Sequence, residues 1–224
     1  MLISLLFFAC EEESTEKKEA IIPTIEATLH LLSAINNSNQ SEVPIYSAFE
    51  NKEKLTEEDG KMSVLVAQAA IYNIHAKTSS TMDHIYQGWA GEEDFTLIGY
   101  LVDRATTESI YAYLGLEVEV GKGIVVAALD YPDLSPVYGA TVDLSVSEQA
   151  FVFAPQARPE EGNTLLTGGS SFVFFPNVEP GQADISVIPP ENVACKSYPA
   201  GEAWSDFTVD VYADTVSIVV FQCE

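Results

Sequence analysis

The stretch GKGIVVAALDYPDLSPVYGATVDLSV, residues 121–146, contains the local patterns that decide the fold. Its first part, Gly123–Leu129, is rich in β-branched residues, and turn residues separate it from the second part. The second part, Thr141–Val146, is a predicted strand whose residues alternate between apolar and polar from Val142 onward, as in a strand that has one face in water. The stretch therefore predicts two β-strands joined by a proline-containing turn.

The same strand pattern recurs along most of the chain and indicates an all-β fold. Tight turns are predicted at residues 59–60 and 180–181, where Gly60 and Gly181 would supply positive φ angles in hairpins. Gly139 would let the chain swing into the next strand. The expected exposed loops are residues 149–169 and 192–204. The other predicted strands are Ile25–Ile35, Met62–Val66, Ile71–Lys77, Phe172–Phe175, Ile185–Ile188, Phe207–Tyr212 and Val216–Phe221.

One segment, Thr106–Leu116, departs from the strand pattern and predicts a short helix. Thr106 or Thr107 can cap its start, and Gly115 is a natural terminator. The preceding apolar stretch, Phe95–Val102, is compatible with either a strand or a continuation of the helical connector. The face expected to pack on a sheet consists of Ile110, Tyr111 and Leu114.

The segments on either side of this helix repeat one order of strands and turns. In the second segment, PVYGATV at 136–142, FVFFPNV at 172–178 and PG at 180–181 resemble the carboxypeptidase regulatory-like domain, a small transthyretin-like β-sandwich. The first segment keeps VPI at 43–45 and EDGKMSV at 58–64 but lacks the Gly-Ala pair.

This resemblance implies two tandem transthyretin-like or immunoglobulin-like β-sandwich domains joined by a short helical connector. The expected division is a degenerate first domain over 21–95, a connector over 96–116 and a second domain over 117–224. In proteins that carry such domains beside a zinc carboxypeptidase, catalysis lies in a separate domain. The resemblance therefore implies a fold and no catalytic activity.

The segment LLFFAC, residues 5–10, ends an apolar run that is too short to cross a bilayer, which takes about 20 apolar residues. The run looks like the apolar part of a secretory signal, although its lack of a basic region leaves open whether the chain starts upstream of Met1. The last residues resemble the lipobox of bacterial lipoproteins. That resemblance implies a signal peptide over 1–9 and a lipid on Cys10. The charged residues that follow have no apolar periodicity and predict an acidic tether over 10–20.

The chain has three cysteines, Cys10, Cys195 and Cys223. Cys10 is the odd one at the place where lipid would attach, although an ordinary buried thiol is the alternative. In an exported protein the other two predict a disulfide. Zinc is the competing interpretation, but neither cysteine has a second Cys or a His at zinc-finger spacing.

The formal net charge of −24 makes binding to nucleic acid or to anionic lipid surfaces improbable, because phosphates would be repelled. Cations and basic partners remain compatible with this charge. The acidic turn Glu57-Glu58-Asp59 and the sequence at 92–94 could offer oxygen ligands to calcium, but neither has the spacing that wraps one ion. No metal and no cofactor is therefore predicted.

No catalytic motif appears in the sequence. His30 and His75 lie in strand patterns without an HxH or HExxH partner, and no GxSxG, P-loop or GxGxxG occurs. Transthyretin-like hydroxyisourate hydrolases end in Tyr-Arg-Gly-Ser, whereas this chain ends in Phe-Gln-Cys-Glu. The exposed aromatics expected to contact a ligand, or to cap the end of a sandwich, are Tyr86, Trp89, Tyr198 and Trp204.

The sequence thus predicts a lipid-anchored, extracytoplasmic, non-catalytic binding or structural module of the bacterial envelope, at the outer membrane or cell surface. Its partners would be the membrane, through the lipid on Cys10, and an unidentified protein or glycan. The alternatives are an accessory subunit of an envelope enzyme or transporter, and a hydrolase that uses surface carboxylates.

Overall fold

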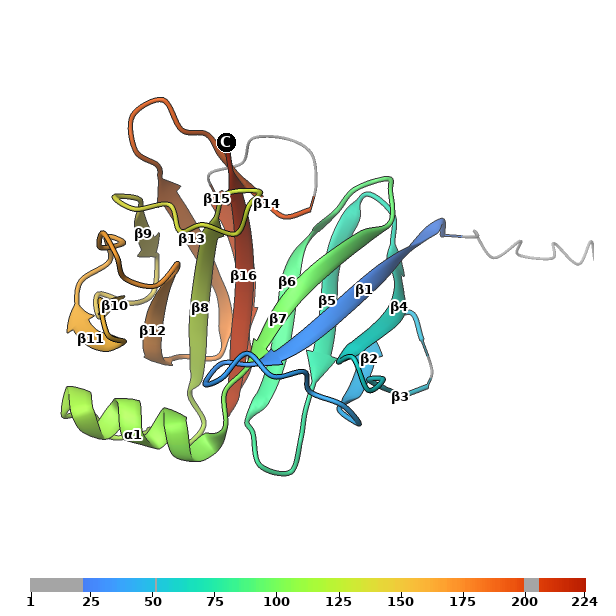
Figure 1. Ribbon diagram of the computed structural model, residues 1–224, viewed down its shortest axis with the longest axis horizontal. Helices are drawn as coiled ribbons and strands as arrows, with labels where there is room; N and C mark the ends of the chain where they lie inside the picture. The colour runs from blue at the N-terminus through green and yellow to red at the C-terminus, as the bar shows by residue number, and fades with distance from the viewer. Residues whose placement is uncertain (1–21, 51, 200–205) are drawn as a thin grey trace, which may run out of the picture.

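A computed structural model of the chain describes residues 22–50, 52–199 and 206–224, and the fold is mostly β-strand with one short helix (Figure 1). The first half of the chain forms the strands β1 Thr24–Ser33, β2 Pro44–Ser47, β3 Lys54–Leu55, β4 Lys61–Ala67, β5 Ala70–Ala76, β6 Asp83–Ala90 and β7 Phe95–Leu101. The helix α1, Arg104–Leu114, follows. The second half forms β8 Gly123–Asp130, β9 Thr141–Leu144, β10 Phe151–Ala154, β11 Arg158–Glu161, β12 Phe172–Val178, β13 Gly181–Ile188, β14 Cys195–Ser197, β15 Asp206–Val211 and β16 Thr215–Cys223.

The two halves repeat one order of strand pairing. In the first half β1 lies between antiparallel β4 and parallel β7, and in the second half β8 lies between antiparallel β12 and parallel β16. The facing sheet is β6-β5-β2 in the first half and β15-β13-β9 in the second, antiparallel throughout. The repeated order of strands and turns in the sequence thus appears as repeated pairing.

Each half encloses its own hydrophobic core between two sheets. Alternation places Ala27, Leu29 and Leu31 of β1 in the first core, where none of them is exposed. Val142 of β9 and Ile185 of β13 are buried in the second core in the same way. Because side chains alternate between the faces of a strand, the intervening polar residues face outward.

One continuous sheet joins the two halves. Its central strand, β16, pairs in parallel with β8 on one side and with β6 on the other, as Figure 1 shows. Ile218 and Val220 of β16 pack against the first core, whereas Val219 and Phe221 lie within the second. The two halves therefore share a strand and are not merely connected by a linker.

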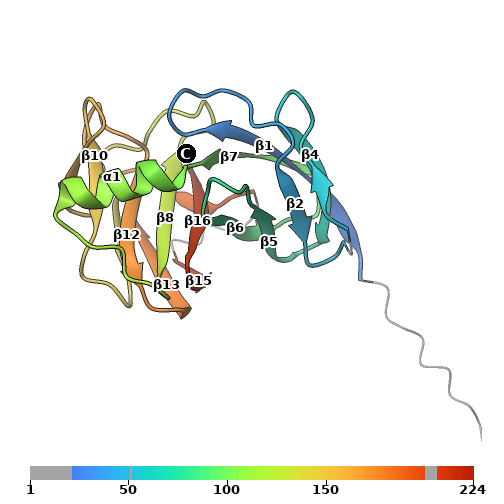
Figure 2. The ribbon, with the colours of Figure 1, turned by 90° about the horizontal axis from the view of Figure 1, so that it is seen from below.

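The helix α1 covers the outer face of the second-half sheet, across β8, β12 and β10 (Figure 2). Tyr111 packs edge-on against Phe174, with ring centroids 5.9 Å apart. The helix ends at Gly115, as predicted, in a left-handed conformation with φ of 69°. It starts earlier than predicted, because the Asp103 side chain caps it by accepting a hydrogen bond from the Thr106 N–H at 2.8 Å.

Some predicted loops and turns are wrong. Residues 149–169 contain the buried strand β10, which pairs with β12, so this segment is not an exposed loop. Residues 192–204 contain β14, which pairs with β16. Of the alternatives for Phe95–Val102, the structure has the strand, β7, so the sheet extends into residues assigned to the connector.

The turn glycines have the predicted backbone but a different role. Gly60 and Gly181 have φ of 77° and 142°, and Gly139 has φ of 84° before β9. The turns at Gly60 and Gly181 are not hairpins, because the strands that each one connects lie in different sheets. Within the ranges described, no helix is long and apolar enough to span a membrane.

Candidate functional site

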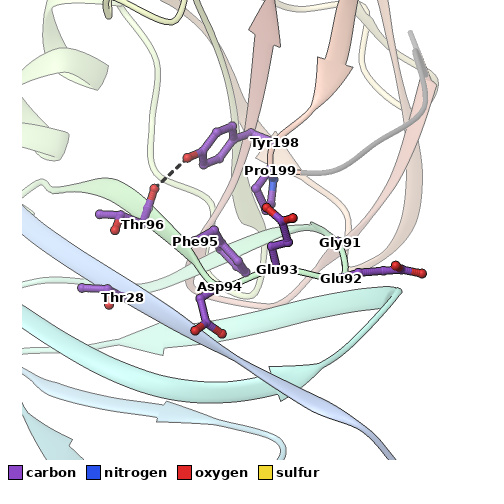
Figure 3. A pocket seen from close by; sticks show the side chains of 9 residues that line it. All are labelled: Thr28, Gly91, Glu92, Glu93, Asp94, Phe95, Thr96, Tyr198 and Pro199. Atoms are coloured by element: carbon purple, nitrogen blue, oxygen red, sulfur yellow. Dashed lines mark hydrogen bonds between the residues drawn. The ribbon is translucent and has the colours of Figure 1, made fainter.

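A groove opens between the start of β7 and the chain that follows β14, where the two halves meet (Figure 3). Its volume is about 770 Å³. The walls combine two aromatic rings with a run of carboxylates, and the lining contains no histidine or cysteine among the residues described. The lining residues are Thr28, Gly91, Glu92, Glu93, Asp94, Phe95, Thr96, Tyr198 and Pro199.

Tyr198, a predicted ligand-contact residue, is held in this groove by contacts with the first half. Its hydroxyl donates a hydrogen bond to the Thr96 carbonyl oxygen at 3.0 Å, drawn in Figure 3, and its own carbonyl accepts one from the Tyr72 hydroxyl at 3.2 Å. The ring meets Phe95 edge-on at 6.4 Å. Burial raises the pKa of the Tyr198 phenol, so it stays a neutral donor at physiological pH.

Gly88 on β6 allows this close approach. A Cβ atom at that position would lie 2.6 Å from the Tyr198 carbonyl oxygen and 2.6 Å from the Tyr72 hydroxyl. No side chain larger than hydrogen fits there without moving one of the two tyrosines. The glycine is therefore required for the second half to reach the groove.

The carboxylates of the groove do not converge on one point. In Figure 3 the side chains of Glu92, Glu93 and Asp94 spread in different directions. One oxygen of Asp94 already accepts a hydrogen bond from the Glu26 N–H at 2.7 Å. This arrangement offers an acidic rim beside two rings, which suits contact with a cationic or polar ligand but does not provide a paired acid and base.

The other predicted ligand-contact aromatics lie elsewhere. Tyr86 is on β6 and only 1% exposed, with its hydroxyl donating to the Tyr100 carbonyl at 2.9 Å, so the expectation of an exposed loop residue is wrong. Trp89 is also on β6 and partly buried. Trp204 lies outside the described residues. Sequence reasoning missed Phe95, whose only signal was an aromatic residue directly after three acidic ones.

The histidines have structural surroundings. His84 is fully buried, with Nδ1 2.9 Å from the Met82 carbonyl oxygen and Nε2 accepting from the Val102 N–H at 3.2 Å. Burial lowers the pKa of His84 to about 4, so the ring is neutral at physiological pH. His75 stacks on Tyr46, with ring centroids 4.5 Å apart, and His30 contacts the Asn39 side chain at 3.1 Å.

The weak calcium candidates Glu57, Glu58 and Asp59 lie on an exposed turn. Asp59 pairs with Lys61 at 3.1 Å, and this hydrogen-bonded neighbour lowers the pKa of the Asp59 carboxyl. Nowhere in the described part of the chain do three metal-ligating side chains gather.

The predicted disulfide between Cys195 and Cys223 is confirmed. It joins neighbouring strands, because the two residues are direct partners in the β14 and β16 pairing, and both are buried. The bond therefore ties β16 to a neighbouring strand, whereas the sequence had predicted a loop around Cys195. Cys10 lies outside the described residues.

Comparison with known proteins gives solved structures of low similarity. No protein family and no curated protein matches the chain, so the resemblance to the carboxypeptidase regulatory-like domain stays a prediction. The minor pilin GBS52 of Streptococcus agalactiae is 12% identical, with 88% of this chain and 94% of that one covered at a TM-score of 0.31. The Bacillus anthracis TIE protein is 11% identical over 88% of this chain, at a TM-score of 0.29.

This chain spans only 33% of the length of the TIE protein. A shaft pilin, SpaA of Lactobacillus rhamnosus GG, is 7% identical, with 90% of this chain and 99% of that one covered at a TM-score of 0.26. At these TM-scores neither fold nor function is drawn from the neighbours. The fold follows from the strand pairing of this chain alone.

Proposed function

We propose that the chain is a lipid-anchored, extracytoplasmic binding module of the bacterial envelope without catalytic activity, built of two tandem β-sandwich domains that share one sheet. The disulfide is the single observation that most supports export, because such bonds persist in oxidising compartments. It also accounts for Cys195 and Cys223 and leaves Cys10 as the cysteine available for lipid.

A binding role is supported by the hydrogen bonds of His84 and Tyr198, which leave neither side chain available for catalysis. Both ring nitrogens of His84 have backbone partners, and the Tyr198 hydroxyl is engaged by Thr96. The His84 bonds lie within the first half, whereas the Tyr198 bond joins the two halves, and neither group is free to move protons. The groove at the junction, with Phe95, Tyr198 and its acidic rim, is then a surface for recognition.

Metabolic labelling with a fatty-acid probe tests the lipid anchor. Wild type should incorporate the label and sediment with membranes, whereas Cys10→Ala should lose the label and be released. A matched control, Cys195→Ser with Cys223→Ser, should keep the label and its membrane association. Unchanged membrane association of Cys10→Ala would overturn the localisation.

The alternatives differ in what accompanies the protein. An accessory subunit predicts one stoichiometric enzyme or transporter partner in a pull-down from solubilised envelope. A hydrolase predicts turnover that a single carboxylate substitution abolishes, and detection of such turnover would replace the binding proposal.

A further inference from the structure

The first-half strands β6, β5, β2 and β3 carry exposed apolar and aromatic side chains on the face that points away from the first core. Tyr46 and His75 are direct cross-strand partners and so share this face, and Ile71 lies on the same side of β5. Leu55 of β3 pairs with Pro44 and falls on the same side. The exposed fractions are 38% for Tyr46, 51% for Leu55 and 47% for Ile71. These residues, with Asn73 and His75, are the open face.

The equivalent surface of the second half is polar, which makes it an internal control. In that half the sheet β15-β13-β9 has the same pairing as β6-β5-β2, but its outward residues are mostly Asp, Thr, Ser and Gln. The two sheets thus have the same strand pairing, but one has a polar outer face and the other an apolar one. A face that only contacts water would be polar, so the apolar face indicates a binding surface. The outward residues of β13 and β15 are Gln182, Asp184, Ser186, Ile188, Asp206, Thr208 and Asp210.

The open face continues the existing interface between the halves. On the same side of the sheet, Ile85 and Gln87 of β6 are 1% exposed. The Gln87 amide reaches the Asp210 backbone on β15, and the Tyr212 ring, 41% exposed, lies 6.4 Å from the His75 ring. The layer of strands that covers the second core thus stops directly beside the open face.

Among the described residues, the outer edge of β15 is paired with Gln87 at Asp210 and has no strand beside it. The Asp210 N–H and C=O point away from β13 toward Gln87, and the same groups of Thr208, two residues earlier, point the same way. In the described part of the chain no hydrogen bond reaches the Thr208 backbone from that side. An extended chain laid along this edge would gain a hydrogen-bonding partner and cover the open face.

Charge indicates which chain would fit. Two lysines beside the open face are held in ion pairs, with Lys77 2.9 Å from Asp83 and Lys54 2.6 Å from Glu50. The surrounding protein carries a formal net charge of −24, and β15 itself carries Asp206 and Asp210. A second copy of this chain would be repelled, whereas lysine and arginine side chains would be attracted.

We propose that the open face and the adjoining edge of β15 bind an extended segment of a partner protein that alternates apolar residues with lysine or arginine. The apolar side chains would cover Tyr46, Ile71 and Leu55, and the basic ones would face Asp206 and Asp210. This proposal deepens the binding function proposed above, because it names the class of partner and a surface separate from the groove.

A synthetic peptide of about eight residues, in which lysine alternates with isoleucine and valine, tests the proposal on the full chain. Saturable one-to-one binding is expected, together with slower amide hydrogen exchange at Thr208. Tyr46→Ala and Ile71→Ser should each weaken binding by about tenfold. The control variants Tyr113→Ala and Ile188→Ser, exposed on α1 and β13, should leave it unchanged.

Two control peptides make the test specific. A version with glutamate in place of lysine and one with alternate backbone nitrogens methylated should both fail to bind. Absence of saturable binding by the lysine peptide, or binding that survives both Tyr46→Ala and Ile71→Ser, would overturn the proposal. Binding of cellohexaose that is lost in Tyr46→Ala would assign the face to glycans and would also overturn it. The Cys10 labelling result is independent of these outcomes.

Discussion

The side-chain amide of Gln87 forms two hydrogen bonds with the backbone of Asp210, donating to its carbonyl oxygen at 2.7 Å and accepting from its N–H at 2.9 Å. The two residues belong to different halves, on β6 and β15. Gln87 is 1% exposed, and its side-chain amide bonds to β15 in the way that the backbone of a neighbouring strand would. This bond pair joins the two halves beside the strand β16, which they share.

We expect Gln87→Ala to lower the free energy of unfolding by about 2 kcal/mol, because the part-buried Asp210 N–H loses its partner. The Asp210 carbonyl keeps the Ser217 hydroxyl, which donates to it at 2.8 Å. Urea unfolding measures the change. Gln182→Ala is the matched control, because Gln182 is exposed and loses only one bond to the Asp210 carboxylate. Equal loss in both variants would contradict this role.

Replacing Cys195 and Cys223 with alanine should lower the free energy of unfolding by about 3 to 4 kcal/mol in the chain-entropy account. The bond closes a loop between residues 28 positions apart, and its loss enlarges the unfolded ensemble. Thermal unfolding of the double variant and of wild type under reducing conditions should agree. A wild type that is insensitive to reduction would be evidence against the bond contributing.

His84 should make the protein less stable as the pH falls from about 6.5 to about 4. The unfolded histidine takes up a proton near pH 6.5, whereas burial lowers the pKa of the folded one to about 4. The unfolded state therefore holds more protons in this window, and about 3 kcal/mol is lost across it. Urea unfolding of wild type and His84→Gln at several pH values measures the difference. If the free energy of unfolding changed equally with pH in wild type and in His84→Gln, His84 would not be the source of the pH dependence.

Asp130 should act in the opposite direction. Burial raises the pKa of its carboxyl to about 6, although a hydrogen bond from Ser171 partly offsets this. The folded state then holds more protons than the unfolded state from about pH 4 to about pH 6, so stability falls as the pH rises through this range. Asp130→Asn should raise the free energy of unfolding at pH 7.5 and leave it nearly unchanged at pH 4. A variant less stable at pH 7.5 would show that the carboxylate is needed.

Local patterns in the sequence predicted much of the fold. Gly115 ends the helix as expected. The strands that lie where the sequence predicts them are β1, β4, β5, β8, β9, β12, β13, β15 and β16. The sequence of β6, DHIYQGWA, gave no signal, because His84 and Gln87 interrupt its apolar pattern. Both side chains are buried, and their hydrogen bonds make this burial tolerable. The start of α1 was misjudged because Asp103 reaches forward to Thr106.

The candidate sites were harder to predict, because they depend on pairs of residues far apart in the chain. Tyr198 was identified as an exposed aromatic, but its place beside Phe95 follows from the shared sheet. Tyr86 was mistaken for a surface residue because a neighbouring glycine resembles a loop signal, whereas Gly88 serves close packing. The open face could not be predicted from the sequence, because its residues come from three strands that only the fold brings together.

Because β16 completes both sheets at once, the first half has an unpaired strand edge at β6 until Thr215–Cys223 has been made. During synthesis the unpaired edge of β6 can pair with a strand of another chain, and a chaperone or rapid export would prevent this. Truncation within β16 should therefore destabilise the first half of the molecule, although the residues of that half are all present.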